Sequence, residues 1–181
     1  VSVIDILAIT TAYFVRVYAG EAATGYHISI WLSLTALSLA LFLATGKRRS
    51  ELTLLSHFQG VVPSDTRNSL THYSEKLLDA YTAMFANSTF ISYAFYTFLE
   101  KPKSVGFFFI GYDQFVSEFP DRKWLMITIP FVLYGIMRYM QLIYEGQGES
   151  PEKILTSDKP LLSTVILWGI TVFLIMYGIG G

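Results

Sequence analysis

The sequence has no cysteine and few charged residues. Without thiols the chain forms no disulfide and offers no thiolate, so two classes of site are excluded and redox arguments leave the compartment open. Only 15% of the 181 residues are charged and 52% are hydrophobic, whereas about 25% of the residues in soluble domains are charged. This composition predicts an integral membrane protein. The chain has 13 Lys and Arg and 14 Asp and Glu, so its formal net charge is -1. Because the chain is not a polycation, we expect no nucleic-acid partner.

Several well-known catalytic motifs are missing as well. The sequence contains neither a nucleophile elbow nor a Walker loop, which argues against serine-hydrolase and P-loop chemistry. His27, His57 and His72 do not have the spacing of metal ligands. We therefore predict no metal site within these residues.

Long apolar runs dominate what remains. A bilayer core of about 30 Å needs about 20 mostly apolar residues in each helix. We predict an all-α membrane domain over 1–181 with five transmembrane helices, at about 2–19, 28–46, 80–99, 124–144 and 160–181. The first run contains Asp5 and Arg16, which is acceptable if these groups face a protein interior.

Glycine and proline mark the expected breaks. Gly25, Gly46 and Gly146 fall at predicted helix ends, and Pro130 should kink the fourth helix. The longer connections, 47–79 and 145–159, are predicted to be loops, and amphipathic stretches within 47–79 favour a helical cap over the cytoplasmic end.

The loop charges predict the orientation. The loops on one side carry eight Lys and Arg, and those on the other side carry four, which favours the first side as cytoplasmic. The alternation of helices then brings a set of polar and charged residues to the cytoplasmic face: Asp5, Lys47, Arg48, Glu51, Tyr73, Arg138 and Asp158.

The basic segment that follows the second apolar run has two interpretations. Lys47, Arg48 and Arg49 are followed by Glu51, and such a cluster is common as a positive-inside anchor. Alternatively it is an anion site, because guanidinium groups bind phosphate oxygens in bidentate fashion and a carboxylate can hold the arginine in place.

Arg138 lies inside the end of the fourth apolar run, in the stretch LYGIMRYMQLIY. A lone cation at such a depth costs about 2.5–3.5 kcal/mol unless it reaches the headgroups or is paired. It therefore either snorkels or faces the bundle and holds a phosphate or a carboxylate such as Asp5 or Asp158. The loop after this helix is either a solvated connector or a lid with glycine hinges.

Five segments together resemble a known family: VIDILAITTAYFVRVYAG, WLSLTALSLALFLATGKRRSEL, THYSEKLLDAYTAMFANSTFISYAFYT, TIPFVLYGIMRYMQLIY and GESPEKILTSDKPLL. In this order they are similar to the C-terminal half of the decaprenyl-phosphate phosphoribosyltransferase branch of the UbiA-type prenyltransferase superfamily. The resemblance extends over nearly the whole chain.

The resemblance implies a nine-helix bundle around a cavity that opens to the cytoplasm and to lipid, of which this chain would form the last five helices. Superfamily members bind Mg²⁺ through an Asn-Asp-x-x-Asp-type motif in the first half. No such motif is present here, so the metal ligands are expected upstream of Val1, and the piece alone is expected to be inactive. Because Val1 opens directly into apolar helical sequence, we expect a fragment or a processed chain.

The family's second acidic motif is replaced by Lys47-Arg48-Arg49-x-Glu51, a departure that fits the phosphoribosyl branch. The implied reaction transfers a 5-phosphoribosyl group from phosphoribosyl pyrophosphate to a polyprenyl (decaprenyl) phosphate at the plasma membrane, for cell wall biosynthesis. We expect Lys47, Arg48 and Arg138 to bind phosphate, with Asp5, Glu51, Asp158 and more weakly Tyr73 in orienting roles. The alternatives are an ordinary UbiA-type prenyltransferase with an aromatic acceptor, a transporter, and a structural membrane segment.

Overall fold

The computed structural model describes residues 2–25, 27–57, 74–99, 124–145 and 151–176. Every regular element in these ranges is helical, as the sequence predicted. The elements are α1 (Ser2–Thr24), α2 (Ile30–His57), α4 (Glu75–Leu99), η1 (Trp124–Thr128), α6 (Ile129–Tyr144), α7 (Pro151–Ser157) and α8 (Lys159–Leu174).

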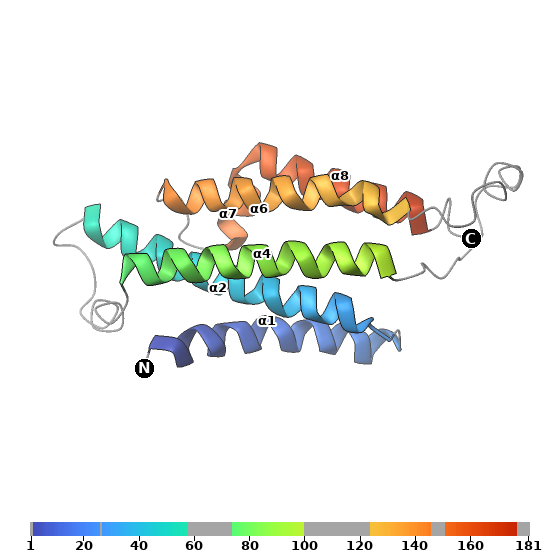
Figure 1. The fold of residues 1–181 in the computed structure, drawn as a ribbon, viewed down its shortest axis with the longest axis horizontal. Helices are drawn as coiled ribbons and strands as arrows, with labels where there is room; N and C mark the ends of the chain where they lie inside the picture. The colour runs from blue at the N-terminus through green and yellow to red at the C-terminus, as the bar shows by residue number, and fades with distance from the viewer. Residues whose placement is uncertain (1, 26, 58–73, 100–123, 146–150, 177–181) are drawn as a thin grey trace, which may run out of the picture.

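The long helices lie side by side with their axes along one direction (Figure 1). Helix α2 packs on α1, α4 and α6, and α8 packs on α6 on the side of the bundle away from α1. The largest buried cluster lies between α2, α4, α6, α7 and α8, and it contains Phe42, Tyr139, Leu142, Ile143 and Ile154. This cluster holds α2 and α6 together and so determines which residues meet at their ends.

The outer surface of the bundle is apolar. Met137 is 63% exposed and Phe173 is 59% exposed, and many other large hydrophobic side chains are also open. Helices α1, α2 and the combined η1–α6 segment are long and apolar enough to cross a membrane. Helix α8 is apolar over a shorter described length, and α4 has the length but carries more hydroxyl side chains. The prediction of an all-α membrane protein is confirmed.

Helix α2 corrects the predicted boundary at residue 46. The helix continues through Gly46 and the whole basic segment to His57, where we had predicted a loop over 47–79, and α4 already begins at Glu75. Gly46 is not a breaker but a point of close approach, because a Cβ there would meet Ile143 Cδ1 at 2.5 Å and Tyr139 Cε1 at 3.1 Å. Packing against α6 therefore outweighs the low helix propensity of glycine.

The other predicted breaks are partly confirmed. Gly25 ends the helical segment with φ +69°, a left-handed conformation that glycine adopts without a Cβ clash. Pro130 lies in the first turn of α6, directly after the 3-10 helix η1, so the fourth apolar run is divided there. Gly146 lies outside the described residues.

The connection 145–159 also differs from the predicted loop, because its second half forms α7. Asp158 separates α7 from α8, and its carboxylate Oδ1 accepts a hydrogen bond of 2.8 Å from the backbone N–H of Leu161. Asp158 is thus the N-cap of α8.

Candidate functional site

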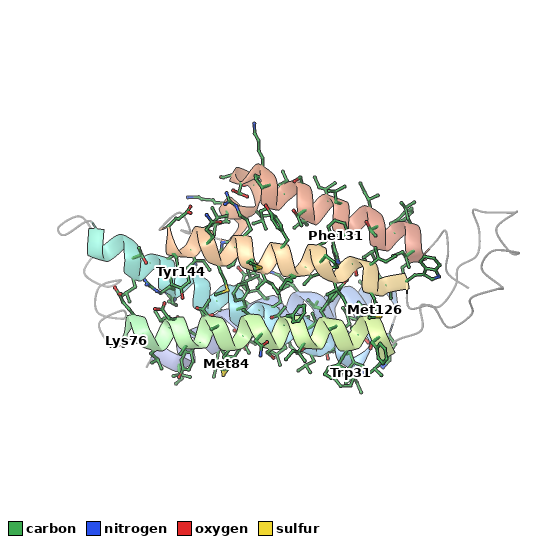
Figure 2. The ribbon with its side chains drawn as sticks, turned by 45° about the horizontal axis from the view of Figure 1, so that its top comes forward. Trp31, Lys76, Met84, Met126, Phe131 and Tyr144 are labelled. Atoms are coloured by element: carbon green, nitrogen blue, oxygen red, sulfur yellow. The ribbon has the colours of Figure 1, made fainter. Side chains whose placement is uncertain are left out.

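Charged side chains gather at one end of the bundle. The first turn of α1, the C-terminal half of α2, the start of α4 and the end of α6 lie at the same end in Figure 1. Figure 2 shows Lys76 and Tyr144 at this end, with Trp31 and Met126 at the opposite one. The described residues therefore show the predicted clustering at one face, and Tyr73 lies outside them.

Arg48 joins α1 to α2. Its Nη2 lies 2.6 Å from Asp5 Oδ2, and its Nη1 donates a 2.5 Å hydrogen bond to Glu51 Oε2. The Arg48 side chain is mostly buried at 14% exposure, whereas the Asp5 side chain is 37% exposed. One guanidinium therefore holds two carboxylates that remain partly open to solvent. Its Nε is buried and has no hydrogen-bond partner among the described residues, so the group keeps a spare donor.

Arg138 joins α6 to α8. Its Nη2 lies 2.6 Å from Asp158 Oδ2, and its Nε lies 3.3 Å from Asp158 Oδ1, a bidentate pair. A third donor, Nη1, reaches Gln141 Oε1 at 2.9 Å, and Gln141 in turn donates to Glu145 at 2.7 Å. Of the predicted alternatives, the structure shows pairing with a carboxylate, and that carboxylate is Asp158.

The Asp158 carboxylate is stabilised in its charged form. The hydrogen bond from Arg138 is the main reason that the pKa of Asp158 is lowered, and the backbone N–H of Leu161 lowers it further, while partial burial opposes both effects. Asp158 therefore serves as an ion-pair partner and a helix cap rather than as a proton donor near neutral pH.

The predicted site residues form two separate groups. Asp5, Arg48 and Glu51 make one group, and Arg138 and Asp158 make the other. No hydrogen bond or ion pair within the described ranges links the two. The orienting roles of the carboxylates and the phosphate-binding roles of the cations both stay predictions. Lys47, on the same turn as Arg48, is partly buried and makes no ion pair with a described residue.

Sequence reasoning missed a third group, centred on Arg49. Arg49 Nε donates a 2.6 Å hydrogen bond to Asp79 Oδ1, and Nη1 donates a 2.6 Å bond to Thr53 Oγ1. The available signal was the spacing of four residues between Arg49 and Thr53 and between Glu75 and Asp79, which places each pair on one helix face. We missed this signal because we predicted that the helix ends at residue 46, so Arg49 and Thr53 were not expected to share a helix face.

The described carboxylates at this end do not make a metal site. Among the described residues, no group of three His, Asp or Glu side chains is arranged to hold a metal ion. Asp5, Glu51, Asp79 and Asp158 are all engaged by arginines. The described residues therefore do not fit Mg²⁺, and we derive no step through it.

The rest of the bundle is joined by neutral polar groups. Trp168 Nε1 donates a 2.8 Å hydrogen bond to the hydroxyl of Tyr93, which lies 2.6 Å from Thr128 Oγ1. Ser38 and Ser88 link α2 to α4 with hydroxyl oxygens 3.0 Å apart. These bonds satisfy polar groups inside the membrane without burying a charge.

The fold and the site together define a multi-pass, all-α membrane protein with ion-paired arginines at one end. Over 176 residues, 97% of the chain, it is 28% identical to the decaprenyl-phosphate phosphoribosyltransferase of Corynebacterium glutamicum, of which it covers 47%. It is 27% identical to the enzymes of the same name from Mycolicibacterium smegmatis, over 92% of the chain, and Mycobacterium tuberculosis, over 94%.

The chain spans about half the length of the curated relatives it matches, covering 47%, 49% and 50% of them. No protein-family model matches it. The resemblance that the sequence indicated is confirmed by these relatives.

Proposed function

We propose that the full-length protein is a membrane transferase that moves a 5-phosphoribosyl group from phosphoribosyl pyrophosphate to decaprenyl or another polyprenyl phosphate. The observation that carries this proposal is the similarity over 97% of the chain to an enzyme named for decaprenyl phosphate and phosphoribosyl transfer. Two further relatives with the same name, matched over 92% and 94% of the chain, support it.

The geometry supports the proposal at the level of substrate chemistry. The acceptor has an anionic head and a long apolar tail, and the donor carries phosphate and pyrophosphate groups. The bundle has cations at one end, beside helices whose outer faces are apolar. A lipid phosphate lying along such a helix would bring its head to the charged end.

In the proposed reaction a phosphate oxygen of the lipid attacks the anomeric carbon of the donor. The new carbon–oxygen bond forms as the bond to pyrophosphate breaks, and the bonding electrons leave with the pyrophosphate. No covalent bond to the protein is needed, so catalysis consists of positioning the two anions and stabilising the leaving group. We assign phosphate binding to Lys47, Arg48 and Arg138.

The carboxylates hold these cations in place. Asp5 and Glu51 bind the two terminal nitrogens of Arg48, and Asp158 holds Arg138 in bidentate fashion. The partly exposed Asp5 and Glu51 keep free lone pairs that would accept hydrogen bonds from ribose hydroxyls. Tyr73 keeps a weaker orienting assignment.

Mg²⁺ remains part of the proposal as a counter-ion for pyrophosphate. Because no group of three described His, Asp or Glu side chains is arranged to hold a metal ion, we propose that its ligands lie upstream of Val1 in the full-length protein. We further propose that the protein lies in the plasma membrane with its charged end in the cytoplasm, since that side carries more Lys and Arg.

The test uses membranes containing the full-length protein, polyprenyl phosphate, Mg²⁺ and phosphoribosyl pyrophosphate labelled in the ribose. We expect label to move into an organic-extractable lipid, and to stay in the aqueous phase when polyprenyl phosphate is omitted. Label that remains aqueous while a prenyl diphosphate reacts with an aromatic acceptor would instead identify an ordinary prenyltransferase of the same superfamily.

A further inference from the structure

Arg49 and Arg48 point to different neighbours of α2. Successive residues of a helix point about 100° apart, so neighbouring arginines face different partners. Arg48 meets Asp5 of α1, whereas Arg49 meets Asp79 of α4. With 9% of its surface exposed, Arg49 is buried between helices.

The Arg49 guanidinium makes directional contacts with three helices. Besides the bonds to Asp79 and Thr53, its Nη2 lies 3.9 Å from Glu75 Oε2. Its central carbon lies 5.2 Å from the centre of the Tyr144 ring of α6, a cation–π contact. These contacts join α2, α4 and α6 within one turn of the helix that carries Arg48.

Two kinds of contact act on α2 at this end. At Gly46, Tyr139 and Ile143 of α6 pack closely against the α2 backbone, which sets how near the two helices come. Less than one turn beyond Gly46, Arg49 adds hydrogen bonds to Asp79 of α4 and to Thr53. Hydrogen bonds from a planar guanidinium have fixed directions, so they constrain the rotation of α2 as well as its distance from its neighbours.

We propose that Arg49 is a positioning residue, which through Asp79 and Tyr144 sets the rotation of α2 so that Arg48 meets Asp5 of α1. The role rests on the proposed function, because Arg48 is taken to bind the phosphates of the donor. Arg49 itself touches neither substrate. Lysine cannot replace it, because a single ammonium cannot reach Asp79 and Thr53 with the same two fixed directions.

The experiment is a double-mutant cycle in the full-length protein. KM for phosphoribosyl pyrophosphate and kcat are measured for Arg49→Lys, Arg48→Ala and the double variant, with the folded amount measured by size-exclusion chromatography. Because Arg49 acts through Arg48, we expect Arg49→Lys to raise KM about tenfold in the wild-type background and less than about twofold when Arg48 is already alanine.

Two further variants make the result decisive. Asp79→Asn keeps the volume of the side chain and is expected to raise KM as Arg49→Lys does. Arg16→Lys makes the arginine-to-lysine change at an exposed position of α1, and it is expected to leave KM within about twofold of the wild-type value. If Arg49→Lys only reduces the folded amount, or raises KM equally in both backgrounds, Arg49 has a structural role and the inference is wrong.

The two proposals fail in different ways. A wild-type protein that is folded but transfers no label to lipid overturns the proposed function, and the positioning role falls with it. If the wild-type protein transfers label but the effects of Arg49→Lys and Arg48→Ala on KM are additive, the proposed function is retained and only the positioning role of Arg49 is wrong.

Discussion

Different interactions join the helices at the two ends of this bundle. Toward the end that holds Tyr93, helices are joined by hydroxyl and indole groups, as in the bonds among Tyr93, Thr128 and Trp168. At the charged end the same task falls to arginine–carboxylate pairs, with N–O distances of 2.6 Å for Arg48–Asp5 and Arg138–Asp158.

Hydrogen bonds between neutral side chains join helices inside a membrane at a lower free-energy cost, because a charge there must be paired or must reach water. Ion pairs add little stability that neutral groups could not supply, since desolvation offsets much of their attraction. The concentration of arginines at one end therefore points to a use for the charge, and it is this end that we assign to phosphate chemistry.

The largest effect is expected from Arg138. Replacing it with alanine removes a proposed phosphate ligand and leaves Asp158 unpaired, so we expect label transfer to fall on the order of 100-fold, the scale of losing one preorganised donor. Lys159→Ala removes an exposed positive charge from the same end and should reduce transfer by less than about threefold. Equal losses in the two variants would mean that only the total charge matters.

Gly46 offers the next test, because α2 and α6 approach each other closely there, near the charged end. We expect Gly46→Ala to destabilise the protein by about 1–3 kcal/mol, because its Cβ would lie 2.5 Å from Ile143 Cδ1 in a fully buried contact. At Gly20 of α1 an added Cβ meets nothing within 4 Å, so Gly20→Ala should raise stability slightly through its higher helix propensity. Thermal unfolding in detergent measures both, and identical shifts would contradict the close approach of α2 and α6.

A smaller effect is expected from Tyr93→Phe. This change removes the hydroxyl that accepts from Trp168 and lies beside Thr128, and a hydrogen bond of this kind contributes about 1 kcal/mol. Thermal stability should fall while KM for the donor is unchanged, because Tyr93 belongs to the neutral network. Tyr134→Phe, at a tyrosine that is 46% exposed, serves as the control. A raised KM in Tyr93→Phe would break the separation of the two regions.

The smallest effect concerns pH. Because the pKa of Asp158 is lowered below its ordinary value of 3.8, chiefly by Arg138, this carboxylate contributes stability above that value and loses it only as the pH falls through its lower folded-state pKa. The stability difference between the wild type and Asp158→Asn should therefore be constant from about pH 8 to about pH 5. A difference that already declines in this range would show that Asp158 is not held as an ion.

Much of the architecture could be predicted from composition and apolar runs. The five predicted helices correspond to α1, α2, α4, η1 with α6, and α8, because the length of an apolar run is a local property of the sequence. The boundary at residue 46 was wrong because glycine and a basic cluster normally end a membrane helix, whereas here the fit of Tyr139 and Ile143 against Gly46 keeps α2 helical.

The sequence by itself determined that this is a membrane protein with more of its Lys and Arg on one side, since hydropathy and the alternation of helices are enough for both. It also indicated that Arg138 needs a partner at its depth. Only the tertiary structure decided which carboxylate of another helix or turn each arginine receives: Asp158 for Arg138, Asp5 for Arg48, and Asp79 for Arg49. The physical reason is that helix rotation and side-chain packing set these contacts at a precision of a few ångströms, and neighbouring positions in the sequence do not contain that information.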